Sequence, residues 1–179
     1  TRKIAWLIEH QKIPARHIAA VTFTNKAARE MKERVQKLLA RKDSRGLIVA
    51  TFHNLGMTIL KAELAASGLR QGFSILDQSD SGELLKGILQ QGESEKDREA
   101  VDFIQMQISR WKTDLVTPES SLSHAEDALQ QRAAVAYGEY NRMLRACNTV
   151  DFEYLLYLPV HLLQQQLLIL NKLRHRIHY

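Results

Sequence analysis

Cysteine is nearly absent from this chain of 179 residues, and so are long apolar runs. The single cysteine, Cys147, cannot form an internal disulfide, and without a second cysteine near a histidine we do not expect a structural zinc site. We expect its thiol to lie in the core. No run approaches the roughly 18 apolar residues of a membrane helix, and the amino end lacks the charged start and apolar core of a secretory signal. These absences favour a cytoplasmic protein with no membrane partner.

The sequence also lacks the motifs that complete several common active sites. A loop that holds nucleotide phosphates needs glycines and a Lys-Ser or Lys-Thr pair, and no Gly-x-x-x-x-Gly-Lys-Ser/Thr segment occurs. A magnesium site needs paired acidic residues at the end of an apolar strand, and a nucleophile elbow needs a serine flanked by glycines. Neither pattern is present. We therefore assign no catalytic, cofactor-binding or metal-binding residue to this chain.

Positive charge is present and is unevenly distributed. Of the 25 lysines and arginines, twelve fall within residues 1–50, which contain four acidic residues, whereas the remainder of the chain has a small acidic excess. This asymmetry favours a partner that carries phosphate groups. The alternative is a solvated helix face, because Lys26 and Lys32 alternate with Glu30 and Glu33 at spacings that stabilise an isolated helix.

The basic segment lies within a predicted strand, helix, strand unit. Residues 18–22 and 47–51 are short apolar runs with the β-branched content of buried strands, and residues 25–41 repeat apolar side chains with a helical period. Two short strands joined by a long helix predict a βαβ crossover with parallel pairing in a covered sheet. Thr24 or Asn25 is expected to cap the helix. Its first amides would then lie beyond the carboxyl end of the strand, where open parallel sheets place ligand sites.

After the second strand the pattern becomes almost entirely helical. Asp80 with Glu83 indicates a capping box, and Thr117 is a candidate cap for a helix that follows. A brief extended piece is expected at 73–76. Apolar periodicity predicts further helices at 1–11, 52–66, 80–92, 96–112, 119–147 and from 151 onward. The expected fold is α/β, with part of a parallel sheet and a mainly helical domain inserted between its strands or appended to them.

Several segments resemble the UvrD/Rep family of superfamily 1 DNA helicases. Residues 20–31 (AVTFTNKAAREM) resemble motif Ia of that family. Residues 51–56 (TFHNLG) resemble its Thr-Phe-His motif. Residues 146–152 resemble the segment that leads back from the helical insertion toward the Walker B strand. The resemblance implies a partial RecA-like (P-loop NTPase) sheet and the following domains. These are 1–52, the first part of domain 1A; 53–160, helical subdomain 1B; and 161–179, a return segment toward domain 1A.

The same resemblance implies a function for a longer parent protein. The chain resembles an internal portion of an ATP-dependent 3′-to-5′ DNA helicase that takes part in replication or repair, uses ATP and Mg²⁺, and binds single-stranded DNA and duplex junctions. Because the Walker A and Walker B motifs are missing from this chain, we expect it to be inactive as an ATPase by itself and to need no cofactor. The alternative is a non-catalytic module that binds nucleic acid or docks a protein and retains a helicase-like fold.

The motif resemblance also nominates residues that contact DNA. They follow the two strands and are Thr22, Phe23, Thr24, Asn25, Lys26, Thr51 and His53. A ring at Phe23 would stack on a base, whereas the alternative is a core phenylalanine at a strand end. A lone histidine such as His53 is often a structural residue. Its place in the Thr-Phe-His motif is the reason for assigning it to DNA contact. Phe52 is expected to point into the core.

Other aromatic and acidic residues are interpreted as structural. Asp151 is expected to cap a helix rather than bind a metal, and Phe152 to pack against the protein. Trp111 lies between two basic residues and offers a DNA contact, but packing within the helical domain is favoured. The side chains at helical spacing in the long helix are expected to form core, namely Tyr137, Tyr140, Met143 and Leu144.

Overall fold

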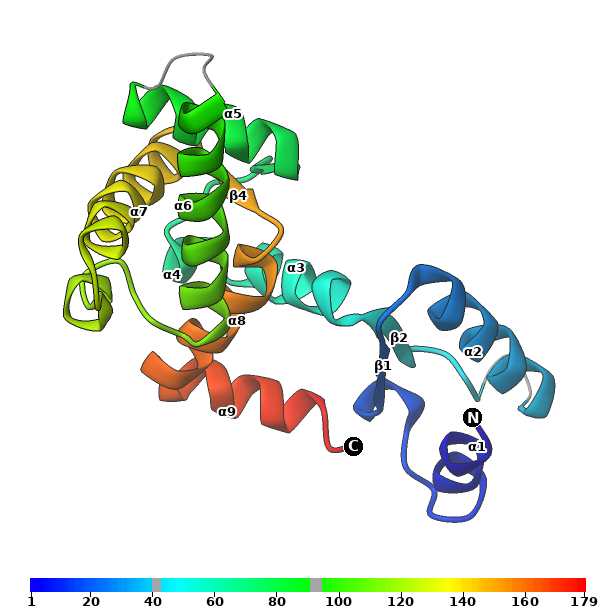
Figure 1. Cartoon of the computed structure of the whole chain (residues 1–179). Coiled ribbons are helices and arrows are strands. Elements are labelled where there is room, and N and C mark those ends of the chain that lie inside the picture. Colours follow the sequence, from blue (N-terminus) through cyan, green and yellow to red (C-terminus); the bar gives the residue numbers. More distant parts are fainter. Residues whose placement is uncertain (40–42, 91–94) are drawn as a thin grey trace. The chain divides into compact units, whose positions relative to one another are not determined.

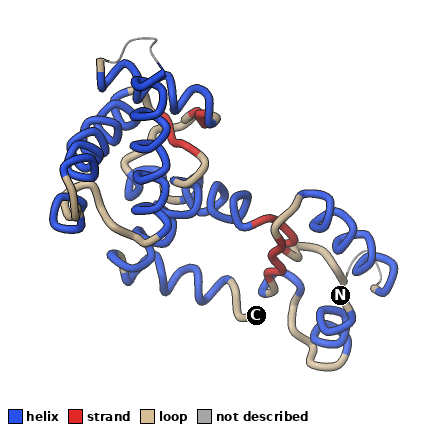
Figure 2. Tube along the Cα trace, viewed as in Figure 1, coloured by secondary structure: helices blue, strands red, loops and turns tan. Residues whose placement is uncertain are grey.

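The computed structural model describes residues 1–39, 43–90 and 95–179, which form two compact units (Figure 1). The first unit comprises Thr1–Ile59 and Leu162–Tyr179, and the second comprises Leu60–His161. Within the described residues the fold is mixed α/β, mostly helical, with two small parallel sheets that appear in red in Figure 2. Among these residues every helix is too short or too polar to cross a bilayer.

The first unit contains the predicted crossover. Its strands pair in parallel, with Ala19 opposite Ile48 and Thr22 opposite Thr51, so the prediction for this segment is confirmed. The elements are α1 (Arg2–Glu9), a 3₁₀ turn η1 (Ala15–His17), β1 (Ala19–Thr22), α2 (Asn25–Leu38), β2 (Ile48–Thr51), the start of α3 (Phe52–Ala62) and α9 (Leu167–Arg176). The basic helix ends at Leu38 rather than at residue 41, and residues 40–42 lie outside the described residues.

The core of the first unit lies where α1 and α2 meet the strands. Leu7 of α1, Val35 of α2 and Ile18 before β1 are all buried in one apolar cluster, and Val35 is completely shielded. Leu7 and Val35 fall on the apolar stripes of their helices, so their burial follows from the helical period.

The last residues of the chain run alongside β1. Ala19 donates its N–H to the carbonyl of Tyr179 at 2.8 Å, and Tyr179 donates to the carbonyl of His17 at 3.2 Å. Ile18 uses its carbonyl to accept from Ile48 of β2. Since alternate residues of a strand direct their backbone groups to opposite edges, Tyr179 lies at the edge of β1 opposite β2.

The second unit is a helical bundle with one short parallel sheet. Ser74 pairs with Thr149 and Leu76 with Asp151, which joins strands far apart in the sequence. The core is formed by completely or nearly completely buried residues from several helices, including Leu60, Leu85, Ile104, Tyr137 and Leu155. The elements are α4 (Leu64–Ser67), β3 (Ser74–Leu76), α5 (Gln78–Leu89), α6 (Glu95–Thr113), a 3₁₀ turn η2 (Ser121–His124), α7 (Ala128–Ala146), β4 (Thr149–Asp151) and α8 (Tyr154–Gln165).

Two predicted helices have different boundaries. The helix expected over 52–66 is divided into α3 and α4 because Glu63 leaves the helical region, with φ −125° and ψ 41°. The helix expected from 119 begins at Ala128, because the Asp127 carboxylate caps it by accepting from the N–H of Gln130 at 2.7 Å. Thr117, the cap expected for this helix, does not cap it. Its hydroxyl accepts from the N–H of Ser120 at 3.2 Å, just before η2.

Two further expectations are corrected by the structure. Helix α5 begins at Gln78, since Asp77 rather than Asp80 supplies the cap by accepting from the N–H of Asp80 at 2.9 Å. The predicted end of this helix at Gly92 lies outside the described residues. Cys147 is exposed rather than buried, because it is the residue at the carboxyl end of α7 where the chain turns toward β4.

Candidate nucleic-acid interface

The two loops that carry the motif residues lie side by side in the first unit. Thr22 and Thr51 are partners in the parallel register and end their strands at the same edge of the sheet. Helix α2 begins at Asn25 and α3 begins at Phe52, so both helix amino ends follow directly from this edge (Figure 1). The amides of a helix amino end favour anions.

Threonine hydroxyls hold both helix starts. Oγ1 of Thr24 accepts from the N–H of Ala27 at 3.1 Å, and Oγ1 of Thr51 accepts from the N–H of Asn54 at 3.2 Å. Thr24 is therefore the cap of α2, one of the two candidates offered by the sequence. Thr24 is exposed whereas Thr51 is buried, so only the first of these hydroxyls faces solvent.

A side-chain hydrogen bond joins the two loops directly. Nδ2 of Asn54 donates to Oδ1 of Asn25 at 3.1 Å across a separation of 29 residues. Asn54 is itself held at its backbone, since its carbonyl accepts from the hydroxyl of Thr58 at 2.8 Å. The sequence did not identify Asn54 as a site residue, because an asparagine after a Thr-Phe-His motif carries no signal of a partner so distant in the sequence.

An exposed aromatic pair is located at the same loops. Phe23 is 87% exposed and Phe52 is 42% exposed, and their ring centroids lie 5.6 Å apart with the planes inclined by 47°. The prediction that Phe52 points into the core is wrong, because its ring lies against Phe23. Lys26 is exposed in the first turn of α2, and His53 is half-buried. The contact thus brings two of the motif aromatics together in a solvent-facing apolar patch.

Positive charge is concentrated in the first unit, and the second unit has an excess of acidic residues. The residues of the first unit include 15 lysines and arginines and 4 acidic residues, whereas those of the second include 10 and 16. The positive potential therefore belongs to the unit that contains the paired loops. A polyanion is favoured there by long-range electrostatics as well as by the helix amino ends.

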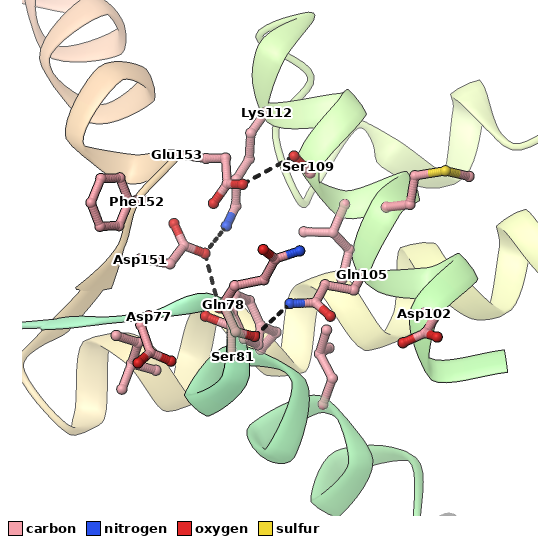
Figure 3. A pocket seen from close by; sticks show the side chains of 15 residues that line it. Asp77, Gln78, Ser81, Asp102, Gln105, Ser109, Lys112, Asp151, Phe152 and Glu153 are labelled. Carbon is pink, nitrogen blue, oxygen red and sulfur yellow. Dashed lines mark hydrogen bonds and ion pairs between the residues drawn. The ribbon is translucent and has the colours of Figure 1, made fainter. Parts of the chain in front are cut away.

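A cavity in the second unit has a different character. Its volume is about 730 Å³, and it lies between α5, α6 and the junction of β4 with α8 (Figure 3). Four carboxylates line it, those of Asp77, Asp102, Asp151 and Glu153. The Ser109 hydroxyl donates to Glu153 at 3.1 Å. Among the described residues no group of three or more His, Cys, Asp and Glu side chains is suited to a metal ion.

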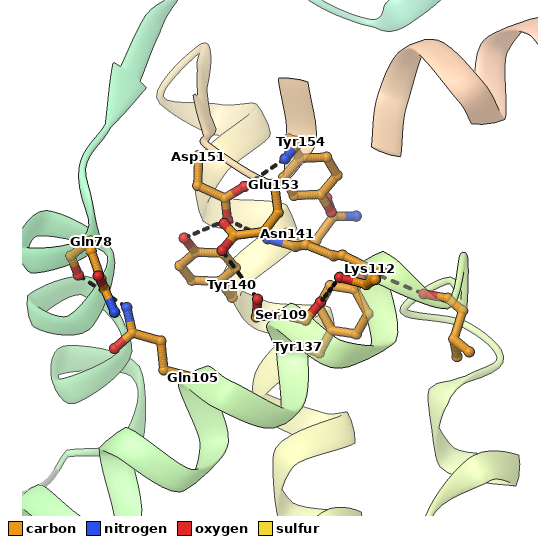
Figure 4. A network of polar contacts seen from close by, with 12 residues as sticks. Gln78, Gln105, Ser109, Lys112, Tyr137, Tyr140, Asn141, Asp151, Glu153 and Tyr154 are labelled. Carbon is orange, nitrogen blue, oxygen red and sulfur yellow. Dashed lines mark hydrogen bonds and ion pairs between the residues drawn. The ribbon is translucent and has the colours of Figure 1, made fainter. Parts of the chain in front are cut away.

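One wall of this cavity is a buried ion pair. Lys112 is paired with Asp151, and the two side chains are 2% and 4% exposed. Asp151 also accepts from the Tyr140 hydroxyl at 2.9 Å and from the N–H of Tyr154 at 2.9 Å (Figure 4). The last bond places Asp151 at the start of α8, so the prediction that it caps a helix is confirmed. The Tyr154 hydroxyl donates onward to Asn141 at 2.5 Å.

Burial determines the protonation behaviour of this network. It lowers the pKa of Lys112, and the neighbouring Asp151 carboxylate opposes that shift. Burial raises the pKa of Tyr140 and of Tyr154, which keeps both hydroxyls protonated as hydrogen-bond donors. The Lys112 ammonium also lies 4.1 Å from the ring centroid of Tyr154, within cation–π range.

The remaining aromatic expectations had mixed outcomes. Trp111 is buried, with its ring centroid 6.2 Å from that of Tyr137, so the expected packing within the helical domain is confirmed. Tyr137, Tyr140 and Leu144 are core residues as expected. Met143 is 39% exposed and Phe152 is 54% exposed, so the predictions that they are core or packed residues are wrong. Met143 lies in α7, where helical spacing alone does not separate buried from exposed positions. Phe152 lies in the turn between β4 and α8, where no helical period applies.

Comparison with known proteins identifies the family. The family model for the UvrD/REP helicase N-terminal domain matches residues 1–179, and the chain belongs to this family. It is 45% identical over 179 residues to "ATP-dependent DNA helicase Rep" of Salmonella typhimurium and 46% identical to the protein of that name in Escherichia coli. It is 31% identical over 180 residues to "ATP-dependent DNA helicase PcrA" of Staphylococcus aureus.

These relatives are much longer than the chain. All of this chain is covered in each comparison, but it spans 26% of each Rep protein and 24% of the PcrA protein. The comparisons therefore identify it with about a quarter of each relative's length.

Proposed function

We propose that this chain supplies a single-stranded DNA-binding surface within an ATP-dependent DNA helicase that moves in the 3′-to-5′ direction. The observation that carries the proposal is the meeting of the two motif loops, joined by the Asn54 to Asn25 hydrogen bond and by the contact of Phe23 with Phe52. Exposed rings suit the stacking of unpaired bases, and adjacent helix amino ends suit phosphates.

The proposal gives the motif residues different tasks. Phe23 stacks on a base, His53 makes a second contact, and Thr22, Thr24, Asn25 and Lys26 bind the backbone of the strand. Thr51 is buried and positions the start of α3. In the longer protein these loops would hold the single strand, including at duplex junctions, while another domain advances along it.

The proposed domain organisation follows the family resemblance. Residues 1–52 would be the first part of a RecA-like domain 1A, residues 53–160 the helical subdomain 1B, and residues 161–179 the return to domain 1A. The parallel pairing of β1 with β2 supports the first assignment, and the hydrogen bonds between Tyr179 and the residues flanking Ile18 support the third.

We infer that this chain by itself holds neither ATP nor Mg²⁺. The sequence contains no Walker A loop, and the described residues include no group of three or more His, Cys, Asp or Glu side chains placed to hold a metal ion. We therefore expect the purified 179-residue chain to release no phosphate from ATP, with or without single-stranded DNA. Hydrolysis that DNA stimulates and that a point substitution within this chain abolishes would contradict the expectation.

The test of the proposed function is the binding of a fluorescent single-stranded oligonucleotide at several salt concentrations. We expect weak binding whose affinity falls as salt rises, because each phosphate contact releases counterions and contributes about −0.7 to the slope of log K against log salt. Lys26→Ala should reduce the magnitude of that slope by about 0.7.

The matched control is Lys37→Ala, which removes the same charge from the last turn of α2. Its position is eleven residues from Lys26, about 16 Å along the helix axis. We expect the slope to stay unchanged in this variant. Equal losses in the two variants would assign binding to the general charge of α2 rather than to the loops.

A further inference from the structure

The geometry of the aromatic pair distinguishes two ways in which it can meet a base. A base inserted between two parallel rings needs about 7 Å between them, which is twice the ~3.5 Å contact distance of carbon atoms. The rings of Phe23 and Phe52 are 5.6 Å apart and inclined by 47°, so they contact each other and leave no such space. Phe23 retains most of its surface for a ligand, whereas Phe52 is more than half covered.

The segment that carries Phe52 is fixed on both sides. Thr51 before it accepts from the N–H of Asn54, and Asn54 after it donates to Asn25 in the other loop. Thr51 is buried, so the start of this turn is anchored in the protein interior. The Phe52 ring therefore presents a fixed surface to Phe23, whose own ring would otherwise choose among several staggered rotamers.

We propose that Phe52 and Asn54 are positioning residues for Phe23. Phe52 supports the ring in the orientation that receives a base, and Asn54 holds the two loops at the distance that this support requires. Neither residue needs to touch the DNA. Pre-organising a ring before binding improves affinity by reducing the ordering that binding would otherwise require. The inference rests on the proposed function, because it assigns the Phe23 surface to single-stranded DNA.

A double-mutant cycle tests the role of Phe52. Affinity for a single-stranded oligonucleotide is measured for the unchanged chain, Phe23→Ala, Phe52→Ala and the double variant. We expect Phe52→Ala to weaken binding by roughly 3- to 10-fold, the range of a coupled aromatic pair. In the Phe23→Ala background the same substitution should cause no further loss, because the ring that it positions is gone.

Two further measurements separate positioning from loss of fold. An oligonucleotide containing 2-aminopurine should lose part of its stacking-induced quenching in Phe52→Ala, while the salt slope stays the same because no phosphate contact is removed. Asn54→Ala, at an exposed position, should weaken binding by about 2- to 5-fold with an unchanged melting temperature. Phe152→Ala, which removes an exposed ring from the second unit, is the matched control and should leave the affinity unchanged.

The outcomes are distinguishable. Independent losses that multiply in the double variant would make Phe52 a separate base contact and overturn the inference. An unchanged affinity in both Phe52→Ala and Asn54→Ala, alongside a loss in Phe23→Ala, would overturn it while leaving the proposed function intact. If Phe23→Ala itself has no effect on a salt-sensitive affinity, the proposed function fails and the inference fails with it.

Discussion

Asp151→Ala is expected to lower the free energy of unfolding of the second unit by about 3–5 kcal/mol, the cost of removing one partner from a buried ion pair. The substitution leaves the Lys112 ammonium inside the protein without its carboxylate, and it also removes an acceptor from Tyr140 and the cap of α8. Urea unfolding measures the change. Fluorescence of Trp111 reports on this unit when Trp6, in the first unit, is replaced by phenylalanine.

The matched control for this prediction is Asp114→Ala. Asp114, directly after α6, pairs with Arg110 of that helix at 3.9 Å, but both side chains are exposed, so the expected change is within about 1 kcal/mol. Lys112→Met should cost less than Asp151→Ala, because Asp151 keeps the Tyr140 hydroxyl and the Tyr154 amide as donors. Equal small losses in Asp151→Ala and Asp114→Ala would show that the buried pair contributes little.

Local sequence patterns predicted the part of the fold that positions the candidate interface. The apolar runs and the helical period between them indicated the strand, helix, strand unit, and the long helical connection favoured parallel pairing of its strands. Parallel pairing then implied that the residues after Thr22 and after Thr51 share one edge of the sheet. The cap at Thr24 also followed from local chemistry. These features depend on residues close together in the sequence or on a connection of known length.

Features that depend on distant partners were not predicted. Strand β4 has three residues and pairs with β3 across about 75 positions, so no periodicity reveals it. Lys112 lies on a helix and follows a buried tryptophan. Its burial is explained by its ion pair with Asp151, a residue distant in the sequence. The position of Phe52 also depends on a residue distant in the sequence. A phenylalanine after an apolar strand suggests core, and only the proximity of Phe23 explains its exposed position.

The two units thus use aromatic and charged residues in opposite ways. In the second unit, tyrosines contact the buried Lys112 to Asp151 pair, and removing one partner would leave the other charge unpaired in the interior. In the first unit, the rings of Phe23 and Phe52 stay at the surface beside a positively charged helix. Exposed rings contribute little to folding, so a substitution there should change binding far more than stability.

Phe23→Ala is accordingly expected to weaken the binding of single-stranded DNA by about 1–3 kcal/mol, which is roughly 5- to 150-fold in Kd. The reason is the loss of a ring that is 87% exposed at the meeting point of the two loops. Leu168→Ala, at a side chain of the same unit that is 86% exposed, is the control and should leave the affinity unchanged. Fluorescence anisotropy gives both values, and matching results for the two variants would remove Phe23 from the DNA-binding surface.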